Sequence, residues 1–288
     1  MKIGIFIHLF NLELLDEFKT YIHKVQSEFG DNIFILFTMQ DNDQHRKVGE
    51  TNLKFIYPYS QVLYIENKGV DFYSLLKQIE YIREREIKLD YILKIHTKIS
   101  TRHHLQNWRK QLILPITDPS SLKYIHHIIS KKAIGYIAAQ ICNFPRTFDI
   151  PLKSNLKGIY NLTKQFPHIN ENYLDFIAGS MFWINYSILE SNFTPELIHF
   201  LSSKMTHGKP PSNFNKEIYP EYVMERLITG PLCFNYTNLL VNENKVETLN
   251  NTNLGLHRPY CFSFHNPKEI METFFPEEKN NLINLIKQ

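Results

Sequence analysis

Apolar and polar positions in the first hundred residues switch between short, continuous apolar runs and longer stretches with helical spacing. Short apolar runs are typical of strands buried on both faces, whereas apolar residues three and four positions apart mark the buried side of a helix. The runs that predict strands are 3–8, 32–38, 61–66 and 91–96, and the stretches that predict helices are 12–29 and 71–87. Strands that alternate with helices require crossover connections, so we expect an α/β fold with a mainly parallel sheet covered on both faces.

The pattern changes after residue 100. Helical spacing recurs at 103–116, 120–130, 194–204 and 220–228, and apolar runs predict further strands at 133–139 and 176–184. From about residue 231 the signals weaken, and we expect a mixed tail packed on the main body. The expected architecture is a single domain, in which residues 1–115 resemble a nucleotide-binding unit, residues 116–230 add a second ligand surface and residues 231–288 form the tail.

Composition narrows the class of protein. The chain of 288 residues is 43% hydrophobic and 21% charged, as in ordinary globular proteins. Its net charge of +3 is spread among interspersed acidic and basic residues, so nucleic acid is not indicated as a partner. Three widely spaced cysteines, Cys142, Cys233 and Cys261, fit neither a disulfide framework nor a cysteine-based zinc site. We therefore expect a reducing compartment.

The chain shows no targeting or membrane-spanning signal. The opening residues lack the basic, apolar and small-residue segments of a signal peptide. No apolar run approaches the ~18 residues that a spanning helix needs. These observations predict a cytoplasmic protein without a transmembrane segment, and they leave peripheral contact with a membrane open.

Polar residues directly follow the predicted strands, at His8, 38–43, 67–71 and 96–98. Ligands of parallel sheets bind beyond the carboxyl ends of the strands, so these residues are candidates for a binding site. Side chains alternate along a strand, so His96 and Lys98 should point to one side and Thr97 to the other. An imidazole beside an ammonium would suit a diphosphate, although a solvated strand end is the plain alternative.

The segment 66–71 predicts a tight turn between a strand and a helix. Gly69 permits the turn, and Asp71 stands where the residue that caps the helix is expected. Asn67 and Asp71 could then face a ligand that lies over the strand ends. An ordinary turn with a capping aspartate would need no ligand at all.

Five segments in a fixed order resemble a known family. These are ENKGVD (66–71), DYILKIHTKIS (90–100), NWRKQLI (107–113), FIAGSMFWI (176–184) and MERL (224–227). Together they resemble the rhamnan synthesis F protein family, glycosyltransferases that build rhamnose-rich surface polysaccharides. The similarity covers roughly residues 1–230. Each segment alone is weak, but five in the same order are fairly specific.

The resemblance implies a GT-A-like fold and a donor in which a sugar is linked to UDP or dTDP. Residues 1–115 would then bind the nucleotide sugar, and residues 116–230 would face the glycan acceptor. The reaction would transfer the sugar, rhamnose by this resemblance, to a hydroxyl group, with inversion. The residues expected to bind the donor are His8, Asn67, Gly69, Asp71, His96, Thr97, Lys98 and Arg109.

The same resemblance bears on metal dependence. It places 96–98 where GT-A enzymes carry an Asp-x-Asp motif that holds Mg²⁺ or Mn²⁺ against the diphosphate. The nearest upstream carboxylate, Asp90, would lie about 20 Å from His96 in an extended strand. It cannot replace that motif. We therefore expect Lys98 and His96, aided by Arg109, to supply positive charge directly, with no metal required as a cofactor.

The acceptor side is expected around Gly179, Ser180 and Trp183. Small residues let a ligand approach the backbone closely, and an aromatic ring is a common platform for a sugar. Inverting transfer needs a carboxylate that takes the proton of the attacking hydroxyl. The candidates for this base are Glu225, Glu221 and Asp175; Glu225 is preferred on the family pattern, with an exposed ion pair to Arg226 as the plain alternative.

Two other functions fit the sequence less well. A nucleotidyltransferase would need a glycine-rich phosphate loop near the N-terminus, and none is present. The missing Asp-x-Asp motif and the basic stretch 98–110 could also belong to a non-catalytic module that binds glycans or nucleic acid. The aromatic residues, however, fall mainly on apolar strand and helix faces, which indicates a core rather than a stacking surface.

Overall fold

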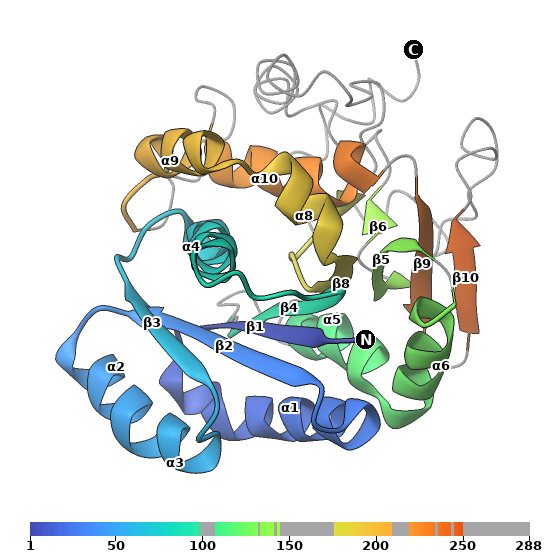
Figure 1. Cartoon of the computed structure of the whole chain (residues 1–288), viewed down its shortest axis with the longest axis horizontal. Coiled ribbons are helices and arrows are strands. Elements are labelled where there is room, and N and C mark those ends of the chain that lie inside the picture. The colour runs from blue at the N-terminus through green and yellow to red at the C-terminus, as the bar shows by residue number, and fades with distance from the viewer. Residues whose placement is uncertain are drawn as a thin grey trace.

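The computed structural model shows an α/β fold, with a central sheet of eight strands in the part of the chain that it describes. The structure describes residues 1–97, 99, 107–131, 133–140, 143–144, 176–208, 219–233, 236–242 and 245–249. The sheet strands are β1 (Ile3–Leu9), β2 (Ile33–Gln40), β3 (Gln61–Ile65), β4 (Tyr91–His96), β5 (Ile134–Ala139), β8 (Phe182–Asn185), β9 (Thr237–Asn242) and β10 (Lys245–Leu249). Their order is β10-β9-β5-β8-β4-β1-β2-β3 (Figure 1).

The sheet is parallel in its N-terminal half and mixed in its C-terminal half. Strands β3, β2, β1 and β4 are all parallel, as crossover connections through helices require. Strand β8 is antiparallel to both β4 and β5, β9 is parallel to β5, and β10 is antiparallel to β9. The predicted α/β class with a mainly parallel sheet is therefore confirmed.

Helices cover both faces of the sheet (Figure 1). One face carries α4 (Val70–Glu84), α8 (Tyr186–Asn192), α9 (Pro195–Lys204) and α10 (Pro220–Thr229). The opposite face carries α1 (Leu15–Phe29), α5 (Trp108–Thr117) and α6 (Pro119–Ile129). Short helices α2 (Asp43–Val48) and α3 (Lys54–Ile56) lie beside β2 and β3, joined by a π-helical turn at Gly49–Leu53. Short 3₁₀ turns are at Leu12–Leu14 and Pro231–Cys233.

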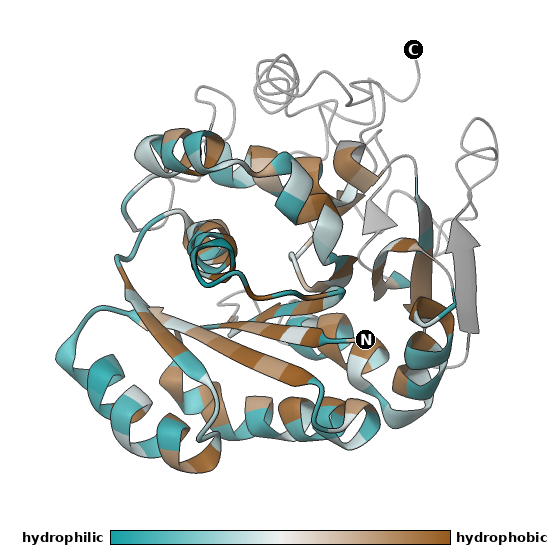
Figure 2. Cartoon of the chain, in the orientation of Figure 1, coloured by the Kyte–Doolittle hydropathy of each residue, from teal (hydrophilic) through white to brown (hydrophobic). Residues whose placement is uncertain are grey.

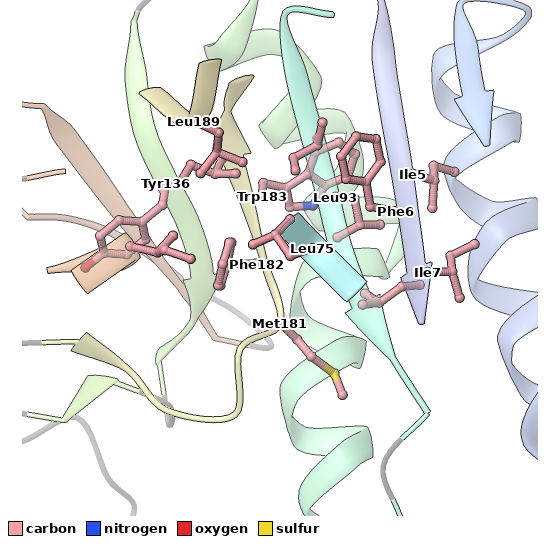
Figure 3. Close-up of a cluster of buried hydrophobic side chains, with 14 of the residues drawn as sticks. Ile5, Phe6, Ile7, Leu75, Leu93, Tyr136, Met181, Phe182, Trp183 and Leu189 are labelled. Atoms are coloured by element: carbon pink, nitrogen blue, oxygen red, sulfur yellow. The ribbon is translucent and has the colours of Figure 1, made fainter. Parts of the chain in front are cut away.

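Apolar side chains of strands and helices meet in one continuous core. In Figure 2 the hydrophobic residues of α1 form one side of the helix, as expected for a helix that packs on a sheet. Figure 3 shows Trp183 of β8 among the buried side chains of the sheet, and its backbone partner on β4 is Leu93. The Trp183 indole N–H donates a hydrogen bond to the Ile116 carbonyl at 3.0 Å. A buried indole thereby keeps a partner for its N–H.

The predicted strands and helices of the N-terminal half are confirmed within a few residues. The predicted helix 71–87 is shorter than expected and ends at Glu84. The helices α2 and α3 were missed, because the polar segment 41–56 shows no long helical repeat. The predicted helix 103–116 begins at Trp108 in the described part of the chain, and residues 103–106 lie outside it.

The prediction of one strand over 176–184 is wrong. The chain instead forms β7 (Phe176–Ile177), then a turn at 178–180, and then β8. Gly179 has φ +86° and Ser180 has φ +56°, which no strand residue adopts. Strand β7 pairs with β6 (Asn143–Phe144) in a separate two-stranded sheet. The apolar run is therefore split between two sheets.

The described part of the segment after residue 231 belongs partly to the main sheet, through β9 and β10. The division of the chain into two halves and a tail stays a prediction. Within the described residues, no helix is both long and apolar enough to span a membrane.

Candidate active site at the strand ends

Three polar side chains lie side by side where the parallel strands end. The register pairs His8 at the end of β1 with His96 of β4 on one side and with Thr38 of β2 on the other. Paired residues of parallel strands point to the same face, which here is the face covered by α4. The sequence placed His8 and His96 at this edge, and the structure brings them together.

A buried lysine stands at the centre of this edge. Lys94 lies two residues before His96 on β4, so both side chains point toward α4. The Lys94 ammonium lies 2.5 Å from Asp71 Oδ2 and 2.8 Å from the Ser180 carbonyl oxygen, and the residue is 2% exposed. His96 Nδ1 lies 3.6 Å from the same Asp71 oxygen. Asp71 therefore joins both basic side chains of β4.

Sequence reasoning missed Lys94, although a signal for it was present. A lysine within the otherwise apolar run YILKIH, two positions before a candidate histidine, should share the face of that histidine. A buried ammonium needs an anionic partner, and that partner is Asp71 at the start of α4. The lysine and the aspartate form one buried unit.

His8 sits beside this unit in a form that resists protonation. Burial lowers the pKa of His8 to about 4; the nearby Lys94 charge acts in the same direction, and Asp71 opposes it. His8 Nδ1 lies 3.2 Å from Thr38 Oγ1, and Thr38 in turn contacts the Ser74 hydroxyl and donates to the Ile7 carbonyl. At neutral pH His8 can therefore donate or accept a hydrogen bond but carries no charge.

The turn before α4 differs from its predicted form. The residue before the helix is Gly69, Val70 is the first helical residue, and Asp71 does not cap the helix. The prediction of an Asp71 cap is wrong because its carboxylate is engaged by Lys94. Gly69 has φ +59°, and a Cβ there would lie 2.4 Å from Met205 Sδ and 2.8 Å from Tyr73 Cβ. Glycine is required at this turn both for its conformation and for space.

The turn is held by a second segment that precedes α10 in the chain. The Gly69 amide donates to the Thr206 carbonyl at 2.8 Å, and the Gly208 amide donates to the Asn67 carbonyl at 2.8 Å. The residue Asn67 is exposed at the end of β3, as expected for a group that could meet a ligand. The segment 206–208 thus fixes one side of the candidate site.

Thr97 ties the ends of β4 and β1 together. Its hydroxyl oxygen accepts hydrogen bonds from the amides of Phe10 and Asn11, both at 2.8 Å. The Thr97 amide donates to the His8 carbonyl at 3.0 Å, and the Asn11 side chain donates to the Thr97 carbonyl at 2.9 Å. The side chain thus holds the backbone that follows β1.

Two predicted residues lie outside the described residues, and a third is engaged by another helix. Lys98 and Asp175 are the two that the structure does not describe. Arg109 of α5 forms a two-pronged ion pair with Glu17 of α1, at 3.0 Å and 2.7 Å. This guanidinium holds the pKa of Glu17 below its ordinary value. The contact joins α5 to α1 on the face opposite α4.

Two carboxylates of α10 bind backbone amides near the site. Glu225 Oε1 accepts a hydrogen bond from the Gly179 amide at 2.8 Å. Glu221 lies one helical turn earlier and is 1% exposed; its Oε1 accepts from the amide and the hydroxyl of Thr206, at 2.6 Å and 2.8 Å. The helix α10 therefore fixes both the turn at 178–180 and the segment that supports Gly69.

Trp183 does not fit its predicted role as a sugar platform. It is fully buried, and its ring lies 5.4 Å from the ring of Phe29 of α1, measured between centroids. No exposed face remains on which a sugar could stack. Ser180 and Gly179, by contrast, lie directly beside the Lys94 ion pair, through the Ser180 carbonyl.

A comparison with models of protein families matches residues 1–203 to rhamnan synthesis protein F. The chain belongs to this family. The match spans the strand-end residues and the turn at 178–180, and it stops before α10. The parallel strands β1–β4, with β8 antiparallel beside β4, agree with the GT-A-like fold that the resemblance implies.

The chain was also compared with curated proteins and with solved structures. No curated protein matches its sequence. Among solved structures, the mannosyltransferase Ktr4p from S. cerevisiae matches 80% of this chain and 66% of its own, at 10% identity and a TM-score of 0.38. A second structure of Ktr4p, in complex with GDP, matches 80% of this chain and 67% of its own, with the same identity and TM-score.

The charges of the described site nearly cancel in this rhamnan synthesis protein F family member. Asp71 neutralises Lys94, and His8 is uncharged at neutral pH. Within this described cluster, His96 is the side chain that could add positive charge, when protonated. Among the described residues, no group of three or more His, Cys, Asp or Glu side chains is arranged to hold a metal ion.

Proposed function

We propose that the protein is a glycosyltransferase that moves a sugar from a nucleotide-diphosphate donor to a hydroxyl of a glycan acceptor. Membership of the rhamnan synthesis protein F family over residues 1–203 carries this proposal. The matched region contains the whole cluster of His8, Asp71, Lys94 and His96. A polar cluster at the carboxyl ends of parallel strands is where ligands bind in such sheets, which supports the same conclusion.

In the proposed arrangement the donor lies over the ends of β1, β2 and β4. His96 and Lys98 face the diphosphate, and uncharged His8 donates or accepts a hydrogen bond. The Asp71 carboxylate compensates the buried charge of Lys94 and lies 3.6 Å from His96 Nδ1. The glycan acceptor approaches from the side of the turn at 178–180.

The finer features of the reaction come from the family. We propose rhamnose as the sugar, UDP or dTDP as the nucleotide, and inversion at the anomeric carbon. The acceptor oxygen attacks that carbon, the bond to the diphosphate breaks, and the diphosphate leaves with the bonding electrons. The hydroxyl proton passes to a carboxylate; from the sequence the candidates for this base are Asp175, Glu221 and Glu225. We also place the reaction in the cytoplasm.

Thermal shift and product analysis test the proposal together. The protein is heated with UDP, dTDP, GDP and the rhamnose conjugates of UDP and dTDP, and release of nucleoside diphosphate is measured with a rhamnose oligosaccharide. A ligand at 100 times its Kd stabilises the native state by about 2.7 kcal/mol, which raises the Tm of a chain of this length by roughly 4 to 5 °C. We expect one donor to do so and to yield an extended oligosaccharide.

Variants of two histidines make the test specific to the site. The H96A variant should lose most of the ligand-dependent shift, whereas H199A, which changes an exposed histidine on α9, should keep it. A protein that shifts with none of these ligands, or that responds to DNA or RNA instead, is not a glycosyltransferase of this kind.

We further propose that His96 and Lys98 supply the charge that a metal supplies in other GT-A enzymes. Turnover should then persist in EDTA at the rate measured with added Mn²⁺. Loss of turnover in EDTA, with recovery on addition of Mn²⁺, would show that a metal is required.

A further inference from the structure

The turn at 178–180 has a backbone conformation that needs external support. Gly179 and Ser180 both have positive φ, which is common for a glycine but unusual for a serine. A non-glycine residue rarely adopts this region and persists there only where its surroundings determine the conformation. The surroundings of this turn must therefore hold it in place.

Two charged side chains hold the turn from opposite ends. Glu225 Oε1 accepts from the Gly179 amide at 2.8 Å, and Lys94 Nζ donates to the Ser180 carbonyl at 2.8 Å. Hydrogen bonds with one ionised partner are roughly twice as strong as neutral ones. Leu112 of α5 closes a third side, since a Cβ on Gly179 would lie 2.6 Å from its Cδ1. The turn is thus fixed by α10, β4 and α5.

The same contacts join the turn to the strand-end cluster. Lys94 binds the turn and Asp71 with one ammonium group, and Asp71 lies beside His96. A shift of the turn would therefore move the Ser180 carbonyl, and with it the Lys94 ammonium that binds Asp71 in the proposed donor site. The link is direct and passes through a single side chain.

We infer that the turn at 178–180 is a preformed part of the sugar-transfer site and that Glu225 is a positioning residue that holds it, not the base. This inference rests on the proposed function. Oxygen Oε1 of Glu225 is committed to the Gly179 amide, and Oε2 lies 3.5 Å from the guanidinium of Arg226. Both oxygens thus have partners within the protein. Lys94 is the second positioning residue, at the other end of the turn.

Substitution of Glu225 by glutamine and by alanine separates the two roles. The glutamine side chain can still accept a hydrogen bond from the Gly179 amide but cannot take a proton, and alanine can do neither. We expect the exchange of amide hydrogens in residues 176–183 to stay as in the wild type in E225Q and to become at least tenfold faster in E225A. Exchange in β1 should stay unchanged in both, which shows that the fold is intact.

Turnover completes the test, with dTDP-rhamnose or UDP-rhamnose as the donor. E225Q should keep kcat within about threefold of the wild type, whereas E225A should lose roughly 100-fold, the scale expected when a reacting group is displaced by about 1 Å. The control E84Q removes an exposed carboxylate of α4 and should change neither measurement.

Three other results would contradict the inference or the function on which it rests. A loss of kcat by 10²-fold or more in E225Q with unchanged exchange would identify Glu225 as the base and overturn the inference. Unchanged exchange in E225A would show that Glu225 does not hold the turn. A wild-type protein that uses neither donor would overturn the proposed transfer of rhamnose, and the exchange difference between E225Q and E225A would still decide whether Glu225 holds the turn.

Discussion

The burial of the Lys94 ammonium depends on its ion pair with Asp71. Its ammonium and the Asp71 carboxylate are both nearly inaccessible to solvent. Removing one member of a buried ion pair leaves the other charge without compensation, whereas replacing both by apolar residues is often neutral. The pair therefore makes the two positions depend strongly on each other.

We predict that K94M lowers the free energy of unfolding by about 3–5 kcal/mol and that the double variant K94M/D71L recovers much of this loss. Urea unfolding followed by circular dichroism measures both. The control K77M breaks the more exposed pair of Lys77 with Glu80 and should cost less than about 1 kcal/mol. Equal instability of the single and the double variant would show that the ion pair is not the cause.

The lowered pKa of His8 makes the free energy of unfolding depend on pH. Its pKa is about 4 in the folded protein, against 6.5 as its ordinary value, so between these values the unfolded chain binds more protons. Stability contributed by neutral His8 is fully present above pH 6.5 and is lost as the pH falls toward 4. The groups that act on its charge are Asp71, Lys94 and His45.

We expect the free energy of unfolding to fall by about 2 kcal/mol between pH 7 and pH 5 because of His8. H8Q should remove most of this decrease, and H199Q, on exposed α9, should keep it. Urea titrations at the two pH values give the result. A decrease of the same size in H8Q would assign the pH dependence to other groups.

Residue types at strand ends were predictable, but their contacts were only partly so. The period of two along β4 was enough to place His96 on the ligand side of the sheet. The same period could have placed Lys94 there, but its partner Asp71 comes from a helix that starts 24 residues earlier in the chain, and no local pattern reveals such a pairing. For Trp183 the sequence could not tell a core indole from a sugar platform, since both are aromatic residues near small ones.

At the scale of elements, two turns set where the strand and helix side chains of the site lie. The turn at Gly69 begins α4, and through it the position of Asp71 is set. It is also bonded to Thr206, which Glu221 holds. A change in this turn should therefore affect both stability and ligand binding.

Two glycines with similar φ allow this to be measured. Gly69 and Gly30 have φ +59° and +66°, but a Cβ on Gly30 would meet no atom within 4 Å. G69A introduces a clash with Tyr73 and Met205, whereas G30A carries a conformational cost alone, since the ψ of Gly30 is −144° and that of Gly69 is 23°. We predict that both variants are less stable than the wild type and that G69A loses the nucleotide-dependent thermal shift, which G30A keeps. A thermal shift that G69A keeps would mean that the neighbours of Gly69 move aside at little cost.

Positive φ also explains which element could not be predicted. The run FIAGSMFWI has the apolar content of a strand, and only Gly179 hinted at a break. That Ser180 shares the conformation depends on contacts with β4 and α10, which are distant in the sequence. The long, regular elements β1, α1, β2, α4 and β4 were predictable because their own periodicity determines them.

Over the whole molecule, the sheet extends beyond the region that the family match covers. The match ends at residue 203, but β9 at Thr237–Asn242 pairs with β5. The pairing is irregular between Ile134 and Ile137, and Asn238 fills the gap: its Oδ1 accepts from the Tyr136 amide and its Nδ2 donates to the Cys233 and Tyr236 carbonyls. A side chain here replaces part of the backbone ladder.

We predict that N238A lowers the free energy of unfolding by about 2–4 kcal/mol, because buried backbone groups lose their partners. N52A, at an exposed position in the turn before α3, should change it by less than about 0.5 kcal/mol. Chemical denaturation compares the two. If N238A were as stable as the wild type, β9 would not be integral to the sheet. The strands β9 and β10 were not predicted, because the three apolar residues 239–241 of β9 and the two separated apolar residues of β10 give too weak a signal.

Strand β8 lies between β4 and β5 in the sheet, so the sheet cannot be completed during synthesis until β8 has left the ribosome. Strand β4 is complete at His96, but β8, which covers its open edge, ends at Asn185. At ~5–20 residues per second, the nascent chain waits roughly 5 to 20 seconds with that edge unpaired. An unpaired edge is a template for wrong pairing, so synthesis in the presence of chaperones should raise the yield of native protein.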